Sequence, residues 1–69
     1  MRIYTVVQGE KPLAVVRASD PGDAIDTALG MIPNDVARTA LDVRDPNDAE
    51  MVGWLSRRED YVTETASAA

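Results

Sequence analysis

The chain has 69 residues, with neither cysteine nor histidine, and a net charge of −5 from 12 acidic and 7 basic side chains. At this length it forms one domain that buries only about 60% of its unfolded surface, so pairing with a partner is favourable. The missing cysteines exclude disulfides and thiolate metal sites and fit a reducing cytosol. The surplus of acids disfavours direct binding to nucleic acid. No apolar run reaches the roughly 20 residues of a membrane span, so we expect a soluble cytoplasmic protein.

The first 18 residues predict an antiparallel hairpin. Residues 2–8 are rich in β-branched and aromatic side chains, which favour a strand. A turn at residues 9–12 contains Gly and Pro, and a second strand follows at residues 13–18. Alternation puts Leu13 and Val15 on one face of this strand, and Ala14, Val16 and Ala18 on the other. Because both faces are apolar, we expect the second strand to lie inside the sheet.

The phrase Asp-Pro-x-Asp-Ala occurs at residues 20–24 and again at residues 45–49. An Asp that caps, a Pro at the first helical position and an Asp near the positive end of the helix dipole together predict a helix start. The first helix is expected from residue 21 to residue 29 or 31, with an apolar stripe at Ala24, Ile25, Ala28, Leu29 and Ile32. The second is expected from residue 46 to about residue 57, with an apolar side at Ala49, Val52 and Leu55 and Met51 beside them.

The remaining segments complete the expected fold. Residues 39–44 alternate between apolar and polar and predict a third strand, with a helix over residues 35–41 as the alternative. Residues 61–63 predict a short last strand at the sheet edge, and residues 65–69 a disordered tail. We therefore expect residues 1–64 to form a single α+β domain. It is a two-layer sandwich whose sheet of three or four strands carries two helices on one face, in the order ββαβα(β).

The residue types argue against catalysis. Without His or Cys the usual pairs of nucleophile and base are absent, and the aspartates at both helix starts already have a structural explanation as capping residues. The acids at residues 42–50 do not fit a calcium loop, because the sixth and twelfth positions counted from Asp45 hold Glu50 and Ser56, where Gly and Glu are required. We therefore expect that the protein is not an enzyme and that it binds neither a metal nor a cofactor.

Two features indicate a surface for another protein. If both helices lie on one side of the sheet, their acids form one negative surface that suits a basic partner, although a merely solvated face is the alternative. Trp54, the only Trp, lies near Met51 and is either an interface anchor or a cover for the end of a thin core. The expected partner-binding residues are Asp23, Asp26, Asp35, Asp42, Asp48, Glu50, Met51 and Trp54.

The run from Val15 to Ile25 after a hairpin, and the later strand followed by the second Asp-Pro-x-Asp-Ala phrase, resemble the layout of very small phage and prophage proteins of the anti-CRISPR type. The resemblance is one of size, charge and layout over most of the chain, so no functional residue is carried over from it. It implies a stoichiometric inhibitor in a phage-infected or prophage-carrying bacterium. Such an inhibitor binds a basic Cas effector subunit and blocks its nucleic-acid-binding surface, as a DNA mimic does.

Two other functions remain as alternatives. The opening hairpin and capped helix also resemble the start of the HicB-type antitoxin domain, a regulatory partner protein. The Pro-Gly-Cys segment that follows the second strand in that domain is missing here, and so is a basic DNA-binding tail. The other alternative is a small structural protein that forms a homodimer through the open sheet edge or through the surface around Trp54.

Overall fold

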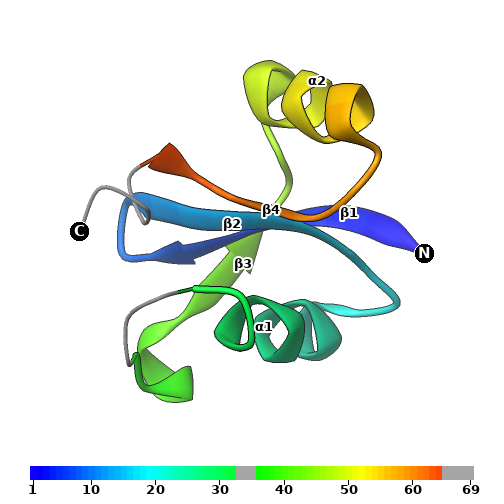
Figure 1. The fold of residues 1–69 in the computed structure, drawn as a ribbon. Coiled ribbons are helices and arrows are strands. Elements are labelled where there is room, and N and C mark those ends of the chain that lie inside the picture. The colour runs from blue at the N-terminus through cyan, green and yellow to red at the C-terminus, as the bar shows by residue number, and fades with distance from the viewer. Residues whose placement is uncertain (33–35, 65–69) are drawn as a thin grey trace.

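A computed structural model describes residues 1–32 and 36–64 of the chain, and within them a four-stranded antiparallel sheet carries one helix on each face (Figure 1). The elements in chain order are β1 (Arg2–Gln8), β2 (Lys11–Ala18), α1 (Pro21–Leu29), the 3₁₀ turn η1 (Arg38–Ala40), β3 (Asp42–Arg44), α2 (Asp48–Arg57) and β4 (Tyr61–Val62). The order of strands across the sheet is β3-β1-β2-β4, so β2 lies inside it. The α+β class, the N-terminal hairpin and the order of elements are confirmed.

The helices lie on opposite faces of the sheet, whereas the sequence predicts both on one face (Figure 1). Successive side chains of a strand point to opposite faces. In β1, Val6 packs into the core with α1, while the neighbouring Thr5 donates a hydrogen bond to Glu50 of α2. The difference arises because the polar side of α2 contacts the sheet, and Thr5, its hydrogen-bond partner, points to the face opposite α1. The result is a helix–sheet–helix arrangement.

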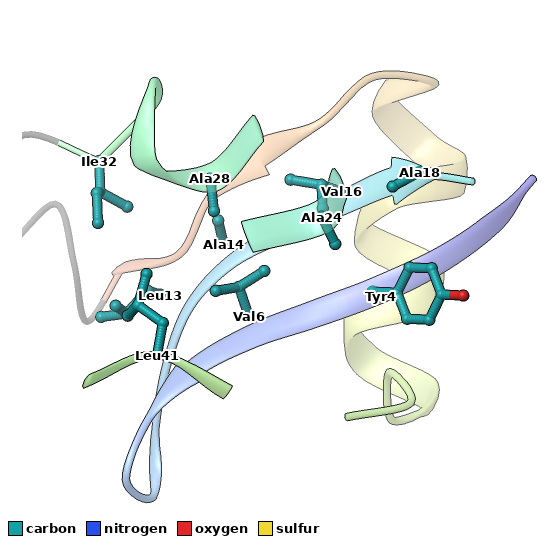
Figure 2. Packing of buried hydrophobic residues seen from close by; sticks show 10 residues of the cluster. All are labelled: Tyr4, Val6, Leu13, Ala14, Val16, Ala18, Ala24, Ala28, Ile32 and Leu41. Atoms are coloured by element: carbon teal, nitrogen blue, oxygen red, sulfur yellow. The ribbon is translucent and has the colours of Figure 1, made fainter. Parts of the chain in front are cut away.

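The hydrophobic core lies between α1 and the sheet (Figure 2). The expected stripe of α1 is confirmed, since Ala24 and Ala28 are buried while Ile25 and Leu29 are half-buried against the same cluster. The small alanine side chains allow the helix to approach the strands closely. The buried cluster consists of Tyr4, Val6, Leu13, Ala14, Val16, Ala18, Ala24, Ala28, Ile32 and Leu41.

A β-bulge in β2 changes the faces expected for this strand. Val6 pairs with Ala14 and Val7 with Pro12, so Leu13 is the extra residue between them. Leu13 consequently joins Ala14 in the core beside α1, although strict alternation put it on the other face with Val15 (Figure 2). A bulge of this kind interrupts the two-residue period of a strand.

Both helices begin with a side-chain cap, but at different places in the repeated phrase. In α1, Asp20 accepts a hydrogen bond from the backbone N–H of Asp23 at 2.8 Å, as expected. The second helix begins two residues later than predicted, because its cap is Asn47. Asn47 accepts from the N–H of Glu50 at 2.8 Å, and the Glu50 carboxylate accepts from the N–H of Asn47 at 2.9 Å, which makes a capping box. Asp45 instead pairs with Arg2.

The third strand is shorter than predicted. Residues 38–40 form η1, and the strand begins only at Asp42, because the chain first turns Leu41 into the core. β3 pairs with β1, with Val43 opposite Val6. The alternative helix over residues 35–41 is present only as the short turn η1, and residue 35 lies outside the described residues. The short last strand is confirmed at the edge beside β2. The disordered tail expected at residues 65–69 also lies outside the described residues. Within the described residues, neither helix is long and apolar enough to cross a membrane.

Candidate functional site

Helix α2 packs on the sheet with its polar side and exposes its apolar side. Glu50 is only 8% exposed, whereas Val52 is 61% and Leu55 55% exposed. The prediction that Ala49, Val52 and Leu55 form the buried side of this helix is therefore wrong, since all three are exposed. The reason lies in the contacts of Glu50.

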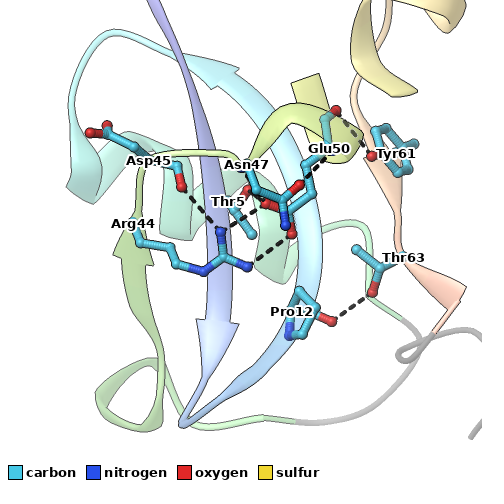
Figure 3. Close-up of polar contacts among 8 residues, drawn as sticks. All are labelled: Thr5, Pro12, Arg44, Asp45, Asn47, Glu50, Tyr61 and Thr63. Carbon is cyan, nitrogen blue, oxygen red and sulfur yellow. Dashed lines mark hydrogen bonds and ion pairs between the residues drawn. The ribbon is translucent and has the colours of Figure 1, made fainter. Parts of the chain in front are cut away.

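The Glu50 carboxylate is the centre of a polar network between α2 and the sheet (Figure 3). Thr5 Oγ1 donates to Glu50 Oε1 at 3.0 Å, and the Arg44 guanidinium donates to both carboxylate oxygens at 2.8 and 2.9 Å. The backbone N–H of Asn47 adds a further bond at 2.9 Å. Thr5 is fully buried in β1, so its hydroxyl requires an acceptor, and Glu50 provides one. These bonds hold α2 against the sheet by its polar side.

The same contacts set the ionisation of Glu50. Burial by itself raises the pKa of this carboxyl, but the hydrogen bonds from Arg44, from Asn47 and from Thr5 outweigh burial, and the pKa lies below its ordinary value. The hydrogen bond to Glu50 likewise raises the pKa of Arg44. The ion pair is therefore intact at neutral pH, and we assign Glu50 a structural role.

The lowered pKa of Glu50 predicts a loss of stability in acid. A carboxyl with a lower pKa in the folded than in the unfolded chain stabilises the fold above its unfolded pKa, and this contribution disappears as the pH falls through the folded pKa. We expect the difference in unfolding free energy between the wild type and Glu50→Gln to be largest near about pH 7 and to shrink towards about pH 3. Urea unfolding of both proteins over this range measures it. A difference that does not vary with pH would contradict the assignment.

Tyr61 of β4 forms the second contact of α2 with the sheet. Its hydroxyl donates to the carbonyl of Glu50 at 3.2 Å, and the Arg57 guanidinium lies over its ring at 4.3 Å from the centroid. Gly53 makes room for this ring, because a Cβ at that position would lie only 2.6 Å from the Tyr61 hydroxyl oxygen. The side of α2 that faces the sheet is therefore occupied by Glu50, Gly53 and Arg57.

The outward side of α2 carries an apolar surface, which we call the α2 patch and define as Met51, Val52 and Leu55. The spacings of three and four residues place these side chains next to one another on the helix. Beside the patch lies a groove of about 460 Å³ at the ends of β1 and β2. The groove is lined by Met1, Arg2, Ile3, Arg17, Asp45, Pro46, Met51 and Trp54. Since Met51 belongs to both and Met1 is 76% exposed, the apolar surface continues from the helix into the groove.

Trp54 has features of both expected roles, as an interface anchor and as a cover for the protein interior. Its Nε1 donates to Asp60 Oδ1 at 3.0 Å, and the same oxygen accepts from the backbone N–H of Arg17 at 2.8 Å. The indole thus ties α2 to the segment before β4 and to β2. It is only half-buried and lines the groove beside Met51. Of the predicted partner-binding residues, these two are brought together in one hollow.

The predicted acidic residues do not gather on one surface. Asp23 and Asp26 lie on α1, whereas Asp48 and Glu50 lie on α2, across the sheet. Asp23 accepts hydrogen bonds from Ser19, and Asp26 forms an ion pair with Arg38. Asp48 and Glu50 differ from each other as well, since Asp48 is exposed and Glu50 is buried.

The two remaining acids do not change this picture. Asp42 is exposed on β3, where its carboxylate accepts from the N–H of Val43 at 2.8 Å. Asp35 lies outside the described residues. Among the described residues, no group of three or more acidic side chains is arranged to hold a metal ion.

Sequence reasoning missed Val52 and Leu55 as surface residues. A signal for their exposure was present, because Glu50, Gly53 and Arg57 recur at spacings of three and four and so share one side of the helix. The polar Thr5 in the middle of β1, between Tyr4 and Val6, was the matching signal on the sheet. Comparisons of the chain with protein-family models, with curated proteins and with solved structures found no match.

Proposed function

We propose that this protein acts by binding another protein molecule through the α2 patch and the adjoining groove, with no catalytic step of its own. The observation that carries the proposal is the orientation of α2, which exposes Val52 and Leu55 while it buries Glu50. A single exposed aliphatic residue is ordinary on a folded protein. Neighbouring apolar side chains on one helix that continue into a groove are typical of an interaction site.

The proposal moves the contact from the acidic residues to the apolar side of α2. The acids of α1 lie across the sheet from the patch, so a partner seated on α2 does not reach them. Asp48 at the start of α2 is the exposed acid nearest to the patch in sequence. In protein interfaces, central apolar contacts provide most of the affinity and a polar rim surrounds them. The α2 patch with Asp48 beside it fits this arrangement.

The resemblance in layout to anti-CRISPR proteins makes a basic Cas effector subunit the first heterologous partner to test. The net charge of −5 favours encounter with such a partner by electrostatic steering. In this form of the proposal, the protein is a stoichiometric inhibitor that covers the effector's nucleic-acid-binding surface with α2.

The experiment uses a bacterium whose CRISPR immunity targets a phage. We expect the wild-type chain to restore plaque formation and the Val52→Asp/Leu55→Asp variant to lose this effect, because each central apolar contact contributes about 1 kcal/mol or more to binding. The matched control is Asp23→Lys/Asp26→Lys, which changes α1 across the sheet and should inhibit as the wild type does. A folded α2 variant that inhibits fully would place the contact elsewhere. A wild-type chain without any effect would remove the Cas effector of that bacterium as the partner.

A further inference from the structure

We infer that the α2 patch binds a second copy of this chain, with the two α2 helices antiparallel about a twofold axis. The inference rests on the proposed function, because it names the occupant of the same surface. A twofold interface must be self-complementary, so that each residue meets a suitable partner from the same surface of the other copy. Both the apolar residues and the charges of α2 meet this requirement.

The apolar part of the surface is centred on the helix. Val52 and Leu55 are adjacent on the outward side of α2, near the middle of its ten residues. A twofold axis that passes between them places Val52 of each copy near Leu55 of the other. Met51 flanks the pair and leads into the groove, where the exposed Met1 of the same copy lies. The contact therefore buries the apolar side chains that α2 leaves uncovered.

The charges at the two ends of α2 have opposite signs. Asp48 is the first residue of the helix and Arg58 caps its end, and the structure gives neither side chain an ionic partner among residues 1–32 and 36–64. About a 1.5 Å rise per residue puts Asp48 and Arg58 at nearly equal distances from an axis between Val52 and Leu55. In an antiparallel pair, Asp48 of one copy therefore lies level with Arg58 of the other, twice, within reach of the long arginine side chain.

The alternatives fit these charges less well. A parallel pair would set Asp48 against Asp48 and Arg58 against Arg58, and would also align the two helix dipoles. A partner with a basic surface, such as the Cas effector subunit named above, matches Asp48 but offers no opposite charge to Arg58. Glu59 follows Arg58 and reduces the charge at that end, so we expect the ionic contacts to determine orientation more than affinity.

The expected dimer is weak. One side of a ten-residue helix and a neighbouring groove offer less than the roughly 800 Å² per partner of a standard interface, so we expect a dissociation constant of about 10–100 µM. A Cas effector that uses the α2 patch would have to compete with the second copy. The self-paired chain would then be the free form of the inhibitor.

The test is sedimentation equilibrium of the purified chain from about 1 µM to about 1 mM. We expect the average mass to rise with concentration from the 7.5 kDa of one chain towards twice that mass. Leu55→Asp should remain monomeric. Asp48→Arg and Arg58→Asp should each weaken pairing about 10-fold or more, because each creates two like-charge contacts. Asp is suited to position 58, where φ is 56°. Glu10→Lys, a charge change in the hairpin turn, should leave pairing unchanged.

Mixing the two charge variants gives the sharpest result. In a heterodimer of Asp48→Arg with Arg58→Asp, both end contacts again join opposite charges, so we expect the mixture to pair as tightly as the wild type. Failure of the mixture to pair would overturn the antiparallel arrangement. A Leu55→Asp dimer would overturn the use of α2. A wild-type chain that remains at 7.5 kDa throughout would overturn self-pairing. Inhibition lost only in Val52→Asp/Leu55→Asp would then still support the proposed function with a different protein.

Discussion

The Glu50→Ala substitution is expected to lower the free energy of unfolding by about 3 kcal/mol. It removes the acceptor of the fully buried Thr5 hydroxyl and one half of the capping box that begins α2. Removing one partner of a buried ion pair costs about 3–5 kcal/mol, but the side chain of Arg44 is 42% exposed and stays hydrated, which places the expected cost at the lower end. For a chain of this size, with a total stability of about 3–10 kcal/mol, that is a large fraction.

Urea unfolding followed by far-UV circular dichroism measures the effect. Asp26→Asn is the matched control, because it removes an acid from an ion pair that is exposed on α1, and we expect a change of no more than about 0.5 kcal/mol. Glu50→Gln keeps the shape of the side chain and part of its hydrogen bonds, so its cost should fall between the two. An unfolding free energy of Glu50→Ala equal to that of Asp26→Asn would show that the network does not hold α2.

Elements specified by neighbouring residues could be predicted from the sequence. The hairpin, the Asp20 cap and the apolar stripe of α1 all depend on residues within one or two turns of chain, and the structure contains them. The start of α2 was also within reach of local reasoning. Asn47 and Glu50 have the spacing of a capping box, but the repeated Asp-Pro phrase at residue 45 suggested an earlier start.

Features set by contacts between distant residues leave only indirect signals in the sequence, such as the polar side of α2 at Glu50, Gly53 and Arg57. The orientation of α2 depends on Thr5, which is 45 residues from Glu50 in the sequence. Without knowledge of this contact, Val52 and Leu55 were the natural choice for the buried side. The bulge at Leu13 likewise depends on how β2 pairs with β1. The candidate site follows from the same contact, because exposing the apolar side of α2 is the consequence of burying Glu50.

The same substitution, Leu to Ala, at two positions tests the stability of the fold separately from binding through the proposed surface. Leu13 is buried at the bulge in the core beside α1, whereas Leu55 is exposed on the outward side of α2. Leu13→Ala should lower the free energy of unfolding by about 2–4 kcal/mol, since it leaves a cavity among packed side chains. Leu55→Ala should change it by no more than about 0.5 kcal/mol, because the site is half in water and Ala is a good helix former.

The order should reverse when self-association is measured. At concentrations where both variants are folded, Leu55→Ala should weaken pairing of the chain about 10-fold, because it removes a central contact of the α2 patch. Leu13→Ala should leave pairing of the folded molecules unchanged, since its side chain lies on the other face of the sheet. Urea unfolding and sedimentation equilibrium on the same two samples give both quantities. If Leu55→Ala proved as destabilising as Leu13→Ala, then α2 would pack with its apolar side inward, and the surface proposed for binding would not exist.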